Sequence, residues 1–550
     1  MHIFSPTSHI RRLLVALTLL PLLCACYDYS MSDIVSSPVD TPQIATANQY
    51  INLSIVVSAG NEGTTRADEK PAGGEDGDGR EAGYEWENKV DGVTFILYAA
   101  NSINEVADND TVSFFKYYPV DLVPPRENSG TQYPSANPNP SKKNKEAVYT
   151  TGDQPVEGLN LSTKYRAIVV ANLDLTNENK FKNATEPIKV KDVLDYTVAR
   201  IHDGSNVGAT AKSMIMSLES DYEVDFENPS ATNQTTNANG TKLTYIFDEI
   251  RIERLAARID FWTNKTYKPS DAGDGEHSGY EYPVYKSTDT DNNPTSGDKF
   301  ILTAITPFNC YSSTEYLFKR IWDSKTEKSE YLADEPQTYI DKDLYVLDPM
   351  TKDKKADNTS INRRSFMTYE LDKIIGNTGN WDKNPRITIK SIKTSNNQWG
   401  NTLRTSEDGK GPDTIIVCYP KENTLLKDSP LYYYATGLRI EGDYYEEGWE
   451  NETVADGAQN PKVTHLIYYG FLRHQGENTT GTYEIYSKEY LEENKDKLVG
   501  KHPMNFGVVR NNIYRISIDR ITERGNEPPQ ITWEIKVKKW DKFTHDTIYM

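Results

Sequence analysis

The sequence predicts an all-β protein, built mainly of strands with a few short helices. The chain of 550 residues contains 36 Tyr, 15 Phe and 8 Trp, and aromatic residues are enriched in strands and supply much area for burial. Apolar and polar residues alternate in short segments along the chain, which is the pattern of half-buried strands. Polar stretches rich in Gly, Asn and Thr separate these segments and predict loops.

The composition argues against several classes of protein. There are 61 Lys and Arg against 81 Asp and Glu, a formal net charge of -20, whereas nucleic-acid binding needs clustered Lys and Arg. Four Cys are too few for a disulfide scaffold or a Cys-rich zinc module. After residue 26 no apolar run approaches the roughly 20 residues of a membrane-spanning helix. The length fits two to four domains at roughly 100–200 residues per domain.

The first 26 residues indicate an exported lipoprotein. Two arginines at positions 11 and 12 precede an apolar run over residues 13–23, which is the layout of a secretory signal peptide and is too short to span a bilayer. The run ends in Leu-Cys-Ala-Cys at 23–26, which resembles the bacterial lipobox. We predict a signal peptide over 1–25 and a lipid, diacylglycerol with palmitate, on Cys26. The alternative is an ordinary secretory signal cleaved near Ala25.

The first half of the chain has a strand pattern that stops at a polar stretch. Strands are predicted over 51–57, 90–98, 110–123, 147–151 and 165–172, where 167–171 is apolar throughout, and a short helix is predicted over 188–200. Residues 58–83 are acidic, Gly-rich and without apolar periodicity, which predicts an exposed segment of the kind that proteases cut. Residues 228–242 are rich in Asn and Thr and predict a loop between two domains, so the second domain begins near residue 247.

The second half has long polar loops followed by strands near its end. Loops are predicted over 268–299 and 350–363. Strands are predicted over 245–261, 465–471, 508–518 and 531–540, with a helix over 487–498. In the last of these strands four apolar residues alternate with polar ones, so a single face is predicted to be buried.

A search for catalytic and metal-binding patterns finds none that holds. The eight His residues lack ligand spacing, and the chain has no nucleophile elbow or phosphate-binding loop. Residues 289–293 begin like a calcium loop, but Pro294 stands where Gly is needed and Phe300 where a bidentate Glu is needed. We therefore expect no enzymatic activity, no catalytic residue, no cofactor and no metal site. Exposed Tyr and Trp could instead stack on glycans.

Two cysteines, Cys310 and Cys418, remain in the mature chain if Cys26 carries lipid and Cys24 leaves with the signal peptide. Both lie in apolar surroundings. They form either a disulfide of the export compartment or two buried, small apolar side chains, and the sequence leaves both alternatives open.

Several segments resemble the fimbrillins of Bacteroidia, the shaft subunits of type V pili. Residues 507–518, Gly-Val-Val-Arg-Asn-Asn-Ile-Tyr-Arg-Ile-Ser-Ile, look like the V-R-N-x-x-Y-x-(V/I)-x-I strand of that family. A Gly/Pro spacer over 525–529 and the alternating strand 531–540 follow, as in the family. Residues 252–259 look like the strand that opens its C-terminal domain. The lipobox, a first strand and an Arg-Ala junction at 66–67 are similar to the layout of a fimbrillin precursor.

The resemblance implies two tandem transthyretin-like β-sandwich domains, over 67–246 and 247–550, behind a propeptide over 26–66. It implies lipidation at Cys26 and cleavage by an arginine-specific protease between Arg66 and Ala67; Arg80 is a rival cleavage site. Loss of the strand 51–57 then opens a groove that a C-terminal strand of another subunit fills. The donor face in this chain consists of four apolar residues: Ile531, Trp533, Ile535 and Val537.

The implied function is a structural subunit of a cell-surface fimbrium that supports adhesion. Its partners are other copies of the chain, accessory fimbrial subunits, the maturation protease, a host or bacterial surface ligand, and the outer membrane, to which the precursor is attached through its lipid. Three alternatives stay open: a membrane-anchored or tip subunit, a glycan-binding surface lipoprotein that never polymerises, and a strand 531–540 that completes its own sandwich.

Overall fold

The computed structural model describes the following residues: 49–57, 85–122, 147–198, 213–226, 234–236, 243–269, 278–290, 293–310, 315–323, 325–332, 344–348, 387–389, 413–452, 460–474, 480–501, 505–525 and 527–539. The lipidation site Cys26, the cleavage sites Arg66–Ala67 and Arg80, and residues 540–550 lie outside them. Within the described part, no helix has both the length and the apolar character needed to cross a membrane.

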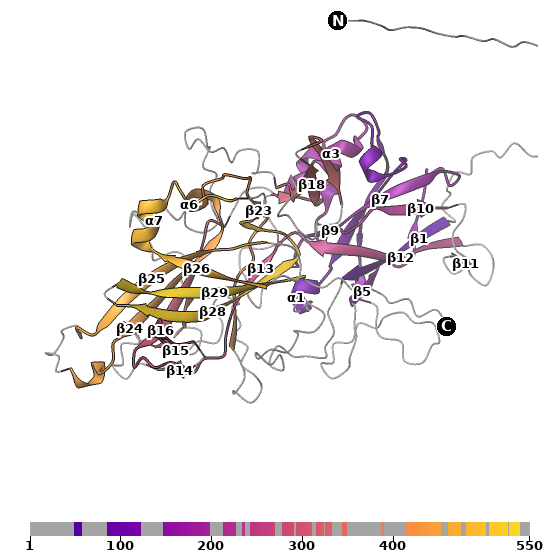
Figure 1. Cartoon of the computed structure of the whole chain (residues 1–550). Coiled ribbons are helices and arrows are strands. Elements are labelled where there is room, and N and C mark those ends of the chain that lie inside the picture. The colour runs from indigo at the N-terminus through magenta and orange to yellow at the C-terminus, as the bar shows by residue number, and fades with distance from the viewer. Residues whose placement is uncertain are drawn as a thin grey trace, which may run out of the picture. The chain divides into compact units, whose positions relative to one another are not determined.

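The first of two large sheets contains the strands of the first half of the chain (Figure 1). Its strands follow the order β3-β2-β7-β9-β12-β1-β5-β4, while β10 pairs with β7, β11 with β12 and β6 with β1. The strand bounds are β1 Gln49–Val57, β2 Gly92–Tyr98, β3 Val112–Pro119, β4 Asp121–Leu122, β5 Ala147–Thr150, β6 Gln154–Pro155, β7 Lys164–Ala171, β9 Met216–Leu218, β10 Tyr222–Asp225, β11 Gln234–Thr236 and β12 Leu243–Arg254.

The second sheet contains strands from the rest of the chain, in the order β14-β15-β16-β24-β25-β26-β29-β28-β13-β22, with β21 paired to β16. The bounds are β13 Arg258–Thr263, β14 Tyr267–Lys268, β15 Gly279–Pro283, β16 Lys299–Phe308, β21 Ile387–Thr388, β22 Asp413–Cys418, β24 Gly437–Tyr445, β25 Val463–Phe471, β26 Thr480–Ser487, β28 Asn512–Arg524 and β29 Glu527–Lys539.

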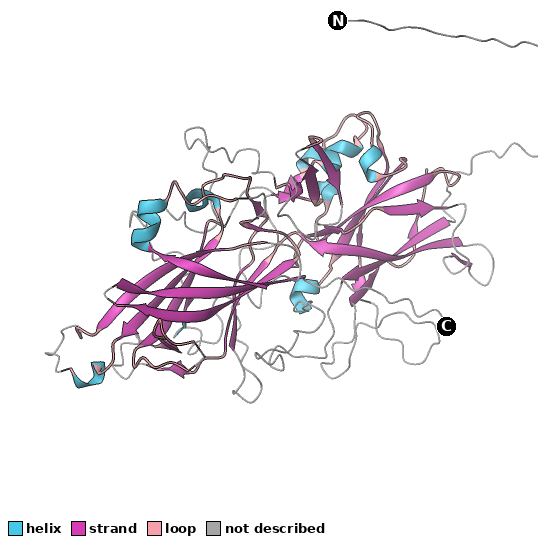
Figure 2. Ribbon diagram, viewed as in Figure 1, coloured by secondary structure: helices cyan, strands magenta, loops and turns pink. Residues whose placement is uncertain are grey.

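Short strands and helices complete the described fold (Figure 2). β8 Thr197–Val198 pairs with β17 Glu315–Tyr316, β23 Asn423–Thr424 pairs with β27 Gly507–Val508, and β18 Arg320–Asp323 lies between β19 Lys328–Tyr331 and β20 Leu344–Val346. The helices are α1 Glu85–Asn88, α2 Asn179–Lys182, α3 Val190–Leu194, α6 Leu431–Tyr434 and α7 Lys488–Asn494, with 3-10 turns η1 Ile103–Glu105, η2 Leu175–Asn177 and η5 Trp449–Asn451. The predicted all-β class is therefore confirmed.

Each large sheet has its own apolar core, and the strand patterns explain both. In β7 the residues from Ala167 to Ala171 are buried on both faces, as the continuous apolar run predicts. In β29 every second residue is buried, and Trp533 lies at the centre of the second core. Gly470 of β25 makes room for its indole, because a Cβ there would overlap the ring of Trp533.

Three elements differ from the sequence-based expectation. The helix predicted over 188–200 is only the short α3, because the chain turns into the bridge with β17 at Thr197. The polar loop predicted over 268–299 contains β15, which pairs with β16. Residues 527–529 of the predicted spacer belong to β29, since Glu527 already pairs with Arg524 of β28.

The chain passes from one sheet to the other between Arg254 and Arg258. β12 extends to Arg254 and pairs within the first sheet, and β13 starts the second sheet at Arg258. This switch comes later than residue 247, where the polar stretch suggested the second domain would begin. The division into two domains itself stays a prediction.

Candidate functional site

The first candidate site is the position of β1 in the first sheet, because the sequence predicts that this strand is removed. β1 runs parallel to β12, from the pair Gln49 and Leu243 to the pair Val56 and Arg251. On its other edge it pairs antiparallel with β5 and β6. Loss of β1 would therefore leave one open edge on β12 and another on β5 and β6.

The side chains of β1 explain how the strand is held. Its inward residues Ile51, Leu53, Ile55 and Val57 are fully buried in the first core. The backbone N–H of Leu53 donates to Thr151 Oγ1 at 3.0 Å, and the N–H of Thr151 donates to the Leu53 carbonyl at 3.2 Å. The predicted strand over 51–57 is confirmed. The space it occupies, here called the β1 slot, is apolar on its inner face and lined by backbone groups along both edges.

The second predicted element, β29, occupies an interior position in its own sheet. It pairs along one edge with β28 and along the other with β26, as the neighbouring ribbons in Figure 1 show. All four predicted donor residues, Ile531, Trp533, Ile535 and Val537, are buried in the second core. This is the arrangement of the alternative in which the strand completes its own sandwich. Its role as a donor to another subunit stays a prediction.

An arm links the two halves of the fold; we use this name for residues 315–323, 325–332 and 344–348. Toward the first half, β17 of the arm pairs with β8, and the Arg320 guanidinium forms an ion pair with Asp195 at 2.6 Å. The Tyr331 hydroxyl also donates to Asp195, at 2.7 Å. Leu317, Phe318 and Leu332 of the arm belong to the first core. This arrangement was not predicted from the sequence.

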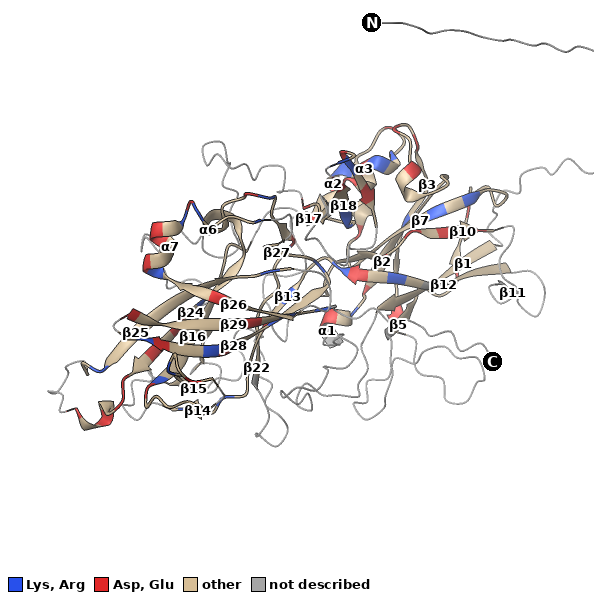
Figure 3. Cartoon of the chain, viewed as in Figure 1, with Lys and Arg blue, Asp and Glu red and all other residues tan. Residues whose placement is uncertain are grey.

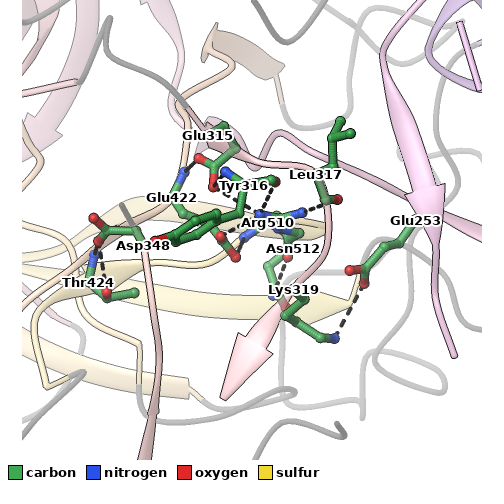
Figure 4. Close-up of polar contacts among 10 residues, drawn as sticks. All are labelled: Glu253, Glu315, Tyr316, Leu317, Lys319, Asp348, Glu422, Thr424, Arg510 and Asn512. Carbon is green, nitrogen blue, oxygen red and sulfur yellow. Dashed lines mark hydrogen bonds and ion pairs between the residues drawn. The ribbon is translucent and has the colours of Figure 1, made fainter. Parts of the chain in front are cut away.

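Toward the second half, the arm is held by a buried ionic cluster around Arg510 (Figure 4). The Arg510 guanidinium forms ion pairs with Glu315 at 2.9 Å and Glu422 at 2.7 Å, and all three side chains are buried. It also donates to the carbonyls of Tyr316 at 2.7 Å and Leu317 at 2.9 Å. A single side chain of the second half thus fixes both the backbone and a carboxylate of the arm.

The carboxylates of this cluster explain its electrostatics. Burial, together with the adjacent carboxylate of Glu422, raises the pKa of Glu315 well above its usual value. Arg510 therefore faces two carboxyl groups, of which Glu315 is the one whose charged form is disfavoured. The Lys319 ammonium pairs with Glu253 of β12 at 3.3 Å, so a second buried ion pair joins the arm to the first sheet (Figure 4).

A second buried cluster fixes the chain where it re-enters the described fold at α1. Arg258 pairs with Glu87 of α1 at 3.0 Å and with Asp260 at 3.0 Å. The Tyr419 hydroxyl donates to Glu87 at 2.5 Å, and Arg254 Nε donates to the Glu87 carbonyl at 3.1 Å. Residues immediately after the predicted cleavage region are therefore anchored independently of β1.

Asn511 connects the two clusters and gives a physical reason for the Val-Arg-Asn segment. It adopts a positive φ of 54°, which Asn tolerates better than most residues, and its Oδ1 accepts from Arg254 at 3.2 Å. Its neighbour Arg510 faces the arm. In the sequence these residues carry the family resemblance; a further signal there is the charged Arg510 next to apolar residues, which implies a buried partner.

The described residues include no cluster of metal-ligating side chains. In the part of the chain that the structure describes, no group of three His, Cys, Asp or Glu residues could hold a metal ion. The Asp289 carboxylate accepts from Thr295 and Lys286 in a turn, and the Thr295 hydrogen bonds hold its pKa below the usual value. Acidic and basic positions are scattered over the strands of both sheets (Figure 3).

Comparison with known proteins gives distant structural likenesses only. No protein-family model matches the chain, and no curated protein sequence matches it. Among solved structures, a protein of Parabacteroides distasonis with a suggested role in cell adhesion is similar with a TM-score of 0.34 and 12% identity, over 90% of this chain and 99% of that one.

Two fimbrial proteins are also similar. The tip fimbrial protein Mfa3 of Porphyromonas gingivalis, truncated at its C-terminus, has a TM-score of 0.30 and 11% identity over 89% of this chain and 100% of that one. A fimbrial assembly protein of Parabacteroides distasonis has a TM-score of 0.27 and 9% identity over 88% of this chain and 93% of that one. All three TM-scores are low, so these likenesses do not establish the role of this chain.

Proposed function

We propose that the chain is a structural, non-enzymatic subunit of a cell-surface fimbrium that polymerises by exchange of a strand in the β1 slot and supports adhesion. In this proposal the precursor is a lipoprotein attached to the outer membrane through Cys26. An arginine-specific protease cleaves after Arg66 and releases β1. The observation that carries the proposal is the interior position of β1, with both edges paired and one face fully buried.

The energetics of the slot favour a replacement strand. Four fully buried side chains of β1 stabilise the sheet by roughly 6–12 kcal/mol, at about 1.5–3 kcal/mol each. An empty slot forfeits this energy and exposes unpaired backbone groups. Association of two subunits costs on the order of 4–15 kcal/mol, so a strand with a similar apolar face gains enough only when the slot is vacant. Cleavage before assembly follows from this requirement.

The anchored α1 supports the same sequence of events. Glu87 and its buried partners hold the chain on the C-terminal side of the predicted cut. Removal of β1 therefore opens the slot while the rest of the first half keeps its attachment to Arg254 and Arg258.

The test compares the exported chain with its Arg66→Ala variant in cells that contain the protease. Protein sheared from the cells should form a ladder of oligomers in mild detergent, and the variant should form none. N-terminal sequencing of the mature chain should find Ala67. A terminus at Cys26 would favour a membrane-anchored subunit, and one at residue 81 would assign the cut to Arg80. Ladders of equal length from the variant would contradict the proposal.

A peptide competitor isolates the slot from the protease. A synthetic peptide of residues 49–57, added to the cleaved chain, should block ladder growth because it refills the slot. The same peptide with Leu53→Lys and Ile55→Lys should not, because both positions are buried there. A peptide with Ser54→Lys, on the opposite face of the strand, is the matched control and should still block. Ladders that are insensitive to all three peptides would place the exchange elsewhere.

A further inference from the structure

The structure brings together two cysteines that are 108 positions apart in the chain. Cys310 follows the end of β16 and is fully buried, while Cys418 is the last residue of β22 and is partly exposed. β16 and β22 lie against each other, and the neighbouring Cys310 thiol raises the pKa of Cys418. Cys310 Sγ also lies 3.8 Å from the Phe308 carbonyl.

The backbone around the two cysteines is fixed on both sides. Asn309 holds a positive φ of 52°, and its side chain donates to the Ala435 carbonyl at 3.1 Å. Its carbonyl accepts from Thr436 Oγ1 at 2.8 Å and from Asn423 Nδ2 at 3.5 Å. Cys418 is paired with Ile259 of β13. Hydrogen bonds therefore hold the segments that carry the two neighbouring thiols.

We propose that Cys310 and Cys418 are a disulfide-forming pair that covalently closes the base of the arm. The chain between them, residues 311–417, contains the whole arm, and the two ends of that chain leave the second sheet at β16 and β22. A disulfide at this point would fix both ends of the segment that contains the arm residues Glu315 and Arg320.

Formation of the bond requires an external disulfide as the oxidant. The partly exposed Cys418 thiolate attacks a sulfur of that disulfide, a mixed disulfide forms, and one thiol leaves. The Cys310 thiolate then attacks the Cys418 sulfur, and the second thiol leaves with the electron pair. Two thiol protons pass to the two leaving sulfurs, and the external disulfide is reduced to two thiols. The neighbouring Cys310 thiol and burial raise the pKa of Cys418, so exchange is slow in the folded chain and faster during folding.

The proposal depends on the proposed export of the chain in one respect, which is that export brings the cysteines into an oxidising compartment. The pairing of the two cysteines is tested separately, on purified protein. The full chain carrying Cys24→Ser and Cys26→Ser is reduced, unfolded and refolded with glutathione disulfide, then denatured and treated with a maleimide. We expect neither remaining thiol to react, and both to react after a reductant is added. Cys310→Ser and Cys418→Ser variants should each show one thiol, either alkylated or carrying one glutathione.

Two results would overturn the pairing: two reactive thiols in the refolded chain, or glutathione on both cysteines. The same alkylation is then applied to protein recovered from the cell surface. Reduced cysteines there, combined with a bond in the refolded chain, would contradict export and leave the pairing intact. Urea unfolding gives an independent readout. The reductant should lower the urea concentration at the unfolding midpoint for the chain that keeps Cys310 and Cys418. It should leave the midpoint of the variant with both cysteines replaced by serine unchanged.

Discussion

Replacement of Arg510 by Met should destabilise the fold strongly, because it removes the guanidinium that pairs with two buried carboxyl groups, Glu315 and Glu422. Met keeps much of the length and apolar volume of the side chain but none of its charge. Glu315 and Glu422 then lose ion pairs at 2.9 and 2.7 Å, and two carbonyls of the arm lose their donor. The perturbation is thus electrostatic rather than steric.

The magnitude follows from the burial of the partners. Removal of one member of a buried ion pair typically costs about 3–5 kcal/mol, since the remaining charge has no compensation. A matched control is Arg524→Met, whose guanidinium pairs with Glu484 at 3.1 Å although both side chains are more than 40% exposed. Exposed ion pairs contribute roughly 0–1 kcal/mol to stability. The free energy of unfolding of the control should therefore lie close to that of the parent chain.

The assay is urea unfolding followed by tryptophan fluorescence, at about pH 5 and about pH 8. In the parent chain the raised pKa of Glu315 means that stability falls as the pH rises above 4.5, the usual value of a Glu, because the folded state then holds more protons than the unfolded state. In Arg510→Met the remaining carboxyl groups stay buried only when protonated, so the loss should be larger at the higher pH. Equal losses in Arg510→Met and Arg524→Met, or a loss independent of pH, would refute this account.

Three further outcomes are expected. Asp443 and Glu441 raise the pKa of His465 from 6.5 to about 9, so the stability that this His contributes is present below pH 6.5 and lost as the pH rises to about 9; His465→Gln should flatten the melting temperature over that window. EDTA should leave the melting temperature unchanged, and a fall of several degrees would revive a metal site near Asp289. Trp533→Asp combined with Ile535→Asp should unfold the second sheet, whereas Thr532→Asp on the other face of β29 should not; a folded double variant that no longer forms ladders would instead support the donor role.

The local part of the fold was predictable because its signal is local. β1, β2 and β7 follow from alternation or from a continuous apolar run, and the structure has them within two residues of the expected bounds. The predicted helix over 188–200 fails for the opposite reason: its apolar residues fit a helix, but Thr197 and Val198 pair with a strand of the arm more than 110 residues later. Tertiary pairing overrides the local preference there.

The candidate sites divide in the same way. The face of β29 was readable from its alternating residues, but its two neighbouring strands depend on the order of the second sheet. The contact of Cys310 with Cys418, and that of Arg510 with Glu315, depend on chain segments more than 100 residues apart. No residue pattern within a single segment predicts which distant residue will contact it. A buried charge such as Arg510 signals only that some partner exists.

The short passage between the two sheets has a mechanical consequence if the chain is, as proposed, a subunit of a fibre. Only residues 255–257 separate β12 from β13, and a chain of three residues extends by roughly 10 Å at most. Tension applied between the sheets would make this link taut almost at once. The arm is a second tether whose hold on the first half is non-covalent, so a pulling force would have to break its ion pairs with Asp195 and Glu253 and withdraw its three side chains from the first core. Because those contacts can form again when the load is removed, the arm would act as a reversible shock absorber within each subunit.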